Sequence, residues 1–205
     1  MRHLTALFGI LLMSALAIGQ TEKRPFQVPE PKGWAKESIN LPPDFASDMK
    51  WKGTEDIRFA PGMFKADATD FFSYALLFWL PDDQKIDSVT MERELLTYYR
   101  GLAKAVLASG KRDGVDFAKF SLTIKDAKVK TGKRPTGEEY VASIGELKWV
   151  EPFATAKPQT LRFEIQTWYV EKHKHHCVFM CVSPQPETNE VWKSLREIRD
   201  GVMFP

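Results

Sequence analysis

Residues 71–80 form an almost wholly apolar run, Phe-Phe-Ser-Tyr-Ala-Leu-Leu-Phe-Trp-Leu, which ends at Pro81. A strand with one face in water alternates polar and apolar side chains, and this run does not alternate. The run is also too short to cross a membrane as a helix, which takes about 20 apolar residues. We therefore expect a central strand that is covered on both of its faces.

The rest of the pattern predicts an α+β domain. A long helix is expected over residues 87–109, with an apolar stripe from Val89 and a stop at Gly110. A C-terminal helix is expected over 187–199, with Val191, Trp192, Leu195 and Ile198 on one face. Strands are expected at 34–41, 55–60, 71–80, 120–124, 138–150, 161–169 and 175–182, with a bulge at Gly145. Short connections predict a mostly antiparallel sheet of about six to seven strands, with one long central helix and a C-terminal helix packed on it.

The first residues have the pattern of a secretory signal peptide. Met1, Arg2 and His3 give a basic start, residues 4–18 carry no Asp, Glu, Lys or Arg, and small residues follow up to Gly19. This predicts a signal peptide over residues 1–19 rather than an uncleaved anchor. Residues 20–33, which contain three prolines, are expected to form an extended leader that is not packed, followed by a single domain over 34–205. The predicted product is exported, periplasmic or secreted, with no transmembrane segment after cleavage.

The charge distribution bears on possible partners. With 29 Lys+Arg and 27 Asp+Glu the net charge is only +2, which argues against a nucleic-acid partner. Basic residues nevertheless outnumber acidic ones over residues 104–134, and Lys128, Lys130, Lys133 and Arg134 are candidates for binding an envelope protein or an anionic ligand. The alternative is a solvated strand and loop. Trp168 is a further partner-binding candidate, unless a helix covers it.

The segment around His175 contains the remaining candidates for chemistry. His173, His175, His176 and Cys177 supply imidazole and thiol groups that suit Zn, Cu or Ni, although their spacing matches no common zinc motif. The alternative is a hairpin tip in solvent. On one strand Cys177 and Cys181 are about 13 Å apart, from ~3.3 Å per residue. That separation is beyond the ~7 Å limit for a disulfide, so buried thiols are expected.

A resemblance to known exported proteins comes from the order of the elements. Leu-Pro-Pro at 41–43 follows a strand, and His-Cys-Val-Phe-Met-Cys-Val-Ser at 176–183 leads into the C-terminal helix. This pattern resembles the PsbP-like exported proteins from about Trp34 onward. Arg-Phe-Ala-Pro-Gly-Met-Phe at 58–64 is also similar to bacterial secreted proteins without an assigned activity. The resemblance implies binding in the envelope more than catalysis.

These features together predict an exported, non-catalytic domain that binds a partner or ligand in the cell envelope. The chain shows no G-x-S-x-G elbow, no phosphate-binding glycine loop and no H-E-x-x-H motif, so we assign no catalytic residue. The alternative function is a metal-binding or metal-dependent protein that uses the His173, His175, His176 and Cys177 cluster. A hydrolase whose carboxylates the sequence does not identify is a third, weaker alternative.

Overall fold

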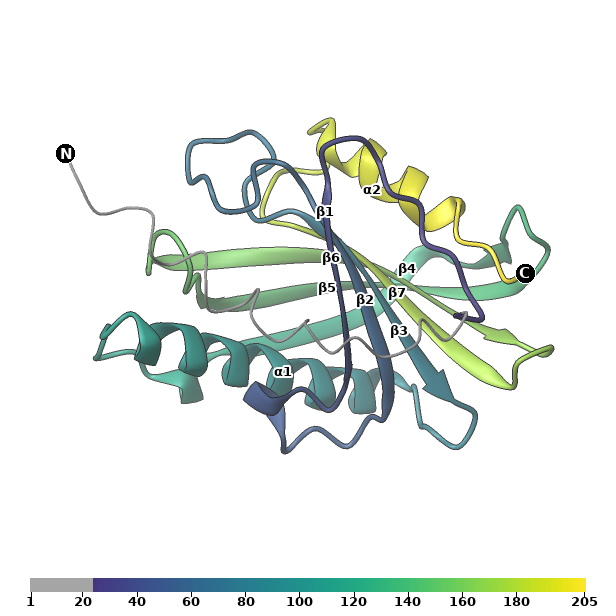
Figure 1. Cartoon of the computed structure of the whole chain (residues 1–205). Coiled ribbons are helices and arrows are strands. Elements are labelled where there is room, and N and C mark those ends of the chain that lie inside the picture. The colour runs from purple at the N-terminus through teal and green to yellow at the C-terminus, as the bar shows by residue number, and fades with distance from the viewer. Residues whose placement is uncertain (1–23) are drawn as a thin grey trace.

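The computed structural model describes residues 24–205, which form a seven-stranded antiparallel sheet with a helix on each face (Figure 1). The order across the sheet is β1-β2-β3-β7-β6-β5-β4. The elements are β1 (Ala35–Leu41), η1 (Asp44–Ala46), β2 (Gly53–Phe59), β3 (Tyr74–Pro81), α1 (Ser88–Ser109), η2 (Phe117–Lys119), β4 (Ser121–Lys133), β5 (Glu139–Val150), β6 (Pro158–Val170), β7 (His175–Ser183) and α2 (Val191–Asp200). The predicted α+β class is confirmed. The predicted signal peptide lies outside the described residues.

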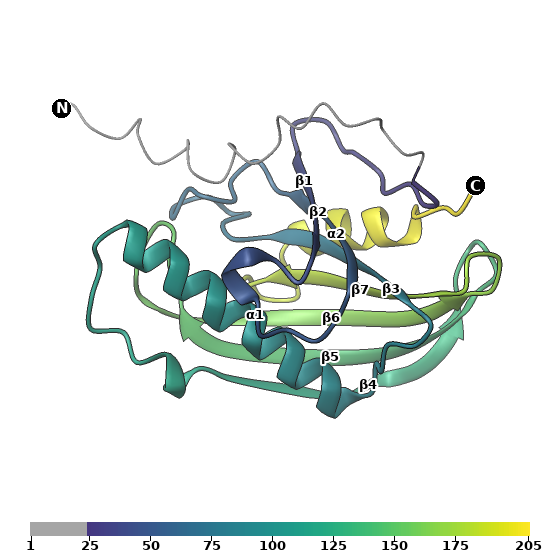
Figure 2. The ribbon, with the colours of Figure 1, turned by 60° about the horizontal axis from the view of Figure 1, so that its bottom comes forward.

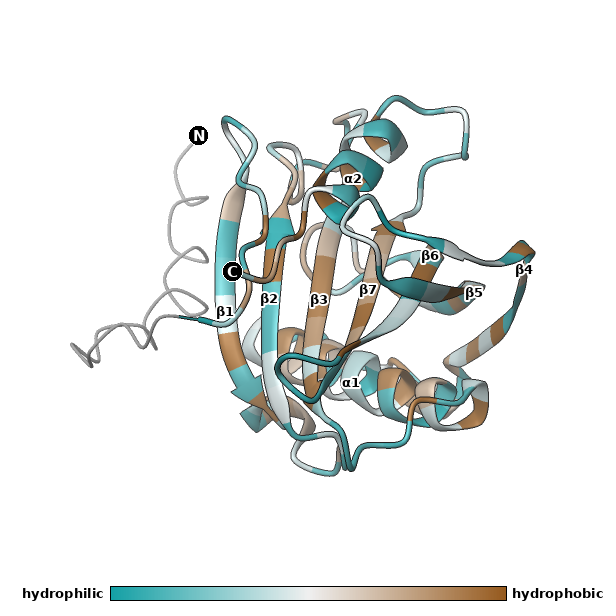
Figure 3. Ribbon diagram, turned by 90° about the vertical axis from the view of Figure 1, so that its right-hand side faces the viewer, coloured by the Kyte–Doolittle hydropathy of each residue, from teal (hydrophilic) through white to brown (hydrophobic). Residues whose placement is uncertain are grey.

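Strand β3 has the central position that its apolar run predicts. It pairs with β2 on one side and β7 on the other, and its side chains are buried from Tyr74 to Leu80. Alternate side chains enter two separate cores: Leu76 and Phe78 pack under α1, whereas Leu77 and Trp79 pack under α2. Figure 2 shows the two helices on opposite sides of the sheet, and Figure 3 shows the mostly apolar colours of β3 and the alternating bands of β4 at the far edge of the sheet.

Helix α1 begins and ends where its sequence predicts. The Asp87 carboxylate accepts a hydrogen bond from the Thr90 amide at 2.9 Å, which satisfies one of the free N–H groups of the first turn. Gly110 is the C-terminal cap. The predicted stripe is wrong at one position, because Val89 is 72% exposed. The buried stripe begins instead at Thr90 and Met91, next to Val89 around the helix.

The predicted bulge lies on another strand. Gly145 pairs regularly with Ile124 of β4 and Phe163 of β6, and the register shifts in β4 instead, between Asp126 and Thr131. A Cβ atom at Gly145 would lie 3.2 Å from the Phe163 side chain. The glycine therefore makes room for the Phe163 ring in the core below α1.

The leader is extended but it is packed, which corrects the sequence prediction. Phe26 and Val28 are buried in the core under α2. Between them Gln27 pairs with Met203, with N–H···O distances of 2.8 and 3.0 Å. Arg58 on β2 donates to the Val28 carbonyl at 3.0 Å. The folded unit therefore includes the chain from about Arg24 onward.

Candidate functional site

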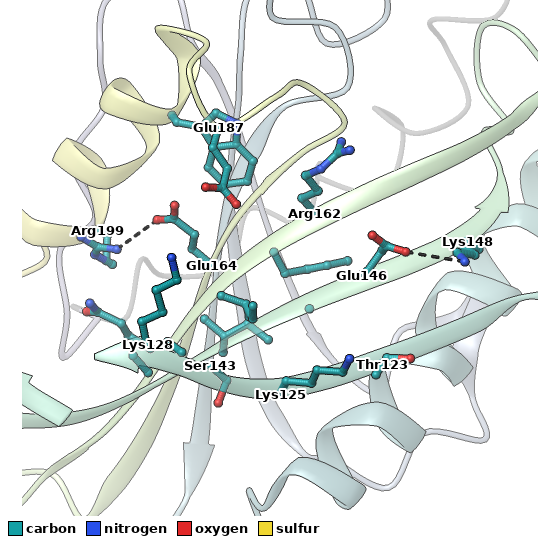
Figure 4. A pocket seen from close by; sticks show the side chains of 18 of the residues that line it. Thr123, Lys125, Lys128, Ser143, Glu146, Lys148, Arg162, Glu164, Glu187 and Arg199 are labelled. Atoms are coloured by element: carbon teal, nitrogen blue, oxygen red, sulfur yellow. Dashed lines mark ion pairs between the residues drawn. The ribbon is translucent and has the colours of Figure 1, made fainter. Parts of the chain in front are cut away.

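A hollow of about 720 Å³ lies on the face of β4, β5 and β6 beside α2 (Figure 4). Helix α2 packs mainly against β7 and β3, so it leaves the outer half of this face uncovered. Several side chains that line the hollow are short, among them Thr123, Ala127 and Ala142. Short side chains beside a packed helix leave the surface concave here.

Strand pairing brings together charges that are far apart in the chain. Thr123, Glu146 and Arg162 form one row across the three strands, and Lys125, Ile144 and Glu164 form the next. Because side chains alternate along a strand, the residues between these positions point to the other face. Leu122, Leu147 and Phe163 lie on that other face, in the core under α1.

Five basic and three acidic side chains line the hollow, and not all of them are paired. Glu164 accepts three hydrogen bonds from Arg196, from Nε to Oε1 and Oε2 at 3.2 and 2.9 Å and from Nη2 to Oε1 at 2.5 Å, and it lies 3.6 Å from Arg199. Glu146 and Lys148 are 3.7 Å apart, from carboxylate oxygen to Nζ. Figure 4 shows the ion pair of Glu164 with Arg199 at one end of the hollow and that of Glu146 with Lys148 at the other.

Three cations of the hollow have no carboxylate partner within residues 24–205. Lys125 and Lys128 are exposed on β4 and make no ion pair. The Arg162 Nη1 atom donates to the Pro184 carbonyl at 2.8 Å, which orients the guanidinium without neutralising it. An uncompensated cation in a concave site attracts anionic ligands.

The structure places only one of the three predicted partner-binding lysines at the hollow. Lys128 lines the hollow. Lys130 and Lys133 are exposed on the same strand but lie outside it, and Lys130 pairs with Asp126 at 2.9 Å. Only Lys128 of these three lysines therefore belongs to the candidate site.

Arg134 and Trp168 are not on the surface, which corrects their assignment as partner-binding residues. The Arg134 guanidinium carbon lies 4.1 Å from the centre of the Trp168 ring, and both side chains are buried. Arg134 donates to the Val202 carbonyl at 2.9 Å, and Phe204 also packs against Trp168. The C-terminal chain thus covers the indole, with α2 nearby in the same core.

The histidine segment is not arranged around one point. The His175 ring stacks on Trp79 with centroids 4.6 Å apart, and its Nδ1 atom lies 2.6 Å from the His173 carbonyl oxygen. His176 points to the opposite face of β7, where it packs on Tyr169 with centroids 4.9 Å apart. Within residues 24–205 no group of three or more His, Cys, Asp or Glu side chains has a geometry that could hold a metal ion.

Both cysteines are free and buried on β7, as the sequence predicts. Burial raises the pKa of the Cys177 thiol well above its usual value and that of Cys181 to about 12. A thiol with a raised pKa is a weak nucleophile and a weak metal ligand at neutral pH, because the thiolate is the reactive form.

One carboxyl group with a strongly shifted pKa lies away from the hollow. Glu55 on β2 is fully buried on the α1 side, where desolvation raises its pKa to about 8. The Tyr98 hydroxyl donates to its Oε1 atom at 2.9 Å, and its Oε2 atom has no partner. It does not line the hollow, so it has no part in the candidate site.

Sequence reasoning missed Lys125, Arg162, Glu164 and Ile144 as site residues. The alternation in β6 shows that Arg162 and Glu164 share a face, but it does not show which strands lie beside them. That information comes from the strand order, which joins the polar faces of β4, β5 and β6.

Comparisons with known proteins identify no family for this chain. No protein-family model, no curated protein and no solved structure matches it. Within residues 24–205 no helix has the length and apolar content that a membrane crossing requires. The resemblance to PsbP-like proteins therefore stays a prediction.

Proposed function

We propose that this protein is a non-catalytic binding domain of the cell envelope that holds an acidic ligand in the hollow on β4, β5 and β6. The observation that carries the proposal is the group of cations formed by Lys125, Lys128 and Arg162, which line a concave surface without a carboxylate partner in the described chain. The volume of about 720 Å³ falls within the ~300–1,000 Å³ of typical small-ligand sites.

The geometry of the lining favours binding over chemistry. Catalytic carboxyl groups combine access to substrate with a shifted pKa. Within residues 24–205 the carboxyl pKa that is raised most is that of Glu55, which is buried under α1, and those of Glu37 and Asp56 are also raised; none of the three lines the hollow. At the hollow, Glu146 and Glu164 are held in ion pairs. The proposed location in the envelope rests on the predicted signal peptide alone.

Two double variants with the same change in charge test the proposal. Lys125→Gln with Lys128→Gln removes two charges from the hollow, and Lys130→Gln with Lys133→Gln removes two charges from the same strand outside it. Inorganic phosphate is added to the full-length protein and amide chemical shifts are followed. We expect shifts that cluster on β4–β6, lost in the first variant and kept in the second. Equal responses of the two variants would show general charge screening and overturn the proposal.

A further inference from the structure

We infer that the ligand of the hollow is an amphiphilic anion, with a phosphate or carboxylate head and a short apolar chain, bound as a single molecule. The inference rests on the proposed function, because it takes the hollow to be the binding site. The cations account for the charged head of the ligand, and the inference adds its apolar chain.

The centre of the hollow is apolar. Ile144 lies at the middle strand, between Lys125 on β4 and Glu164 on β6, and it is 49% exposed. Ala142, two residues along the same face, also lines the floor. An exposed branched apolar side chain in a concave polar site offers a surface that water covers poorly. An alkyl chain lying over Ile144 would remove this surface from water.

The cations lie on both sides of that apolar centre. Lys125 and Lys128 come from β4, and Arg162 comes from β6 beyond it. Among the described residues 24–205, the Pro184 carbonyl is the one hydrogen-bond partner of the Arg162 guanidinium, at Nη1, so its other N–H groups are available to a ligand. A planar guanidinium suits the oxygens of a phosphate or carboxylate, and a lysine adds charge without strict geometry.

The shape favours a single molecule over a membrane surface. A flat bilayer contacts the rim of a concave surface, whereas a small ligand also contacts the side chains that line it, such as Ala142. A dissolved amphiphile can place its chain over Ile144 and its head against the cations at the same time. The inferred ligand is therefore a monomer.

Calorimetric titration of the full-length protein with two probes tests the inference. The probes are inorganic phosphate and hexyl phosphate, which share a head group and differ in the alkyl chain. We expect hexyl phosphate to bind at least about tenfold more tightly, since each buried methylene contributes ~0.8 kcal/mol. Ile144→Thr should remove most of this advantage, measured as the ratio of the two affinities in the same variant. Val141→Thr is the matched control, because Val141 is 43% exposed on the opposite face of β5.

The outcomes separate the inference from the proposed function. If both probes bind equally and Arg162→Gln weakens both, the acidic-ligand site stands and the amphiphile is wrong. If neither probe binds, the proposed function fails, and the inference fails with it. In a third arm the protein is sedimented with vesicles of phosphatidylcholine and phosphatidylglycerol. Sedimentation that is lost in Lys125→Gln with Lys128→Gln, and kept in Lys130→Gln with Lys133→Gln, would assign the hollow to a membrane surface and overturn the monomeric ligand.

Discussion

The guanidinium carbon of Arg134 lies 4.1 Å from the ring centre of Trp168, inside the core that α2 covers. The same side chain donates to the carbonyls of Arg199 and Val202, at 3.2 and 2.9 Å, and lies 3.4 Å from Glu138. One residue therefore joins the β4–β5 hairpin, the C-terminal part of β6 and the C-terminal end of α2. Its role is structural.

Replacing this arginine should destabilise the fold. We expect Arg134→Ala to lower the free energy of unfolding by about 2–4 kcal/mol, because it removes a buried stack and the hydrogen bond to the buried Val202 carbonyl. Lys133→Ala, at the neighbouring exposed position, should change it by no more than about 0.5 kcal/mol. Urea denaturation measures both. Similar losses in the two variants would contradict the structural role.

Glu55 should make stability depend on pH in a specific direction. Its pKa is raised from 4.5 to about 8, mainly by desolvation, with smaller contributions from Glu37 and Asp56. The folded protein keeps this proton over a range in which the unfolded chain loses it. Stability should therefore fall as the pH rises from about 4.5 to 8 and then level off, at ~1.4 kcal/mol per pH unit at most.

The matching variant is Glu55→Gln, which is neutral at every pH. Its free energy of unfolding relative to the wild type should increase between pH 5 and pH 8, as followed by urea denaturation at several pH values. Ionisable groups elsewhere are common to both proteins and cancel in the difference. A difference that stays constant with pH would show that Glu55 titrates normally.

Gly101 in α1 should not tolerate a methyl group. A Cβ atom there would lie 2.1 Å from the Phe45 carbonyl oxygen, where η1 packs on the helix. Helix propensity alone predicts that Gly→Ala stabilises by about 1 kcal/mol. We expect the contact to outweigh it, so that Gly101→Ala lowers the free energy of unfolding by about 1–3 kcal/mol.

The control for this prediction is Ala105→Gly, an exposed position of the same helix, where propensity alone should cost about 1 kcal/mol. Thermal denaturation of both variants tests the packing. A rise in melting temperature for Gly101→Ala would mean that η1 does not lie against α1 in solution.

The histidine segment should respond to substitution through packing. We expect His175→Ala to lower the melting temperature by a few degrees, because it removes the stack on Trp79. Zinc added to the wild type should leave the melting temperature unchanged, since His176 points away from His175 and the Cys177 thiol is buried. A stoichiometric metal in native mass spectra, lost in His175→Ala, would revive the metal-binding alternative.

Local patterns predicted much of the fold. The apolar run in β3, the stripe of α2 and the caps of α1 are determined by residues close together in the chain, so they were correct to within a few residues. The predicted bulge at Gly145 was wrong. The glycine is needed because the Phe163 side chain packs against it from the neighbouring strand, and the sequence does not show which strand is the neighbour.

The candidate site was much less predictable. Trp168 occupies a face that looks polar from Arg162 and Glu164, but Arg134 and Phe204 cover it from distant parts of the chain. Lys125 and Arg162 likewise line the same hollow only because β4 pairs with β5 and β5 with β6. Neither the covering of Trp168 nor this strand pairing can be predicted from residues that are close together in the sequence.

The pairing of β3 with β7 has a consequence for the order of events during synthesis. Leu77 lies opposite Phe179, so the two central strands are separated by more than half of the described chain. Until residues 175–183 leave the ribosome, one edge of the most apolar strand has no hydrogen-bonding partner. The chain therefore completes its sheet late in synthesis, and the pairing that closes the centre of the sheet is among the last that it can form.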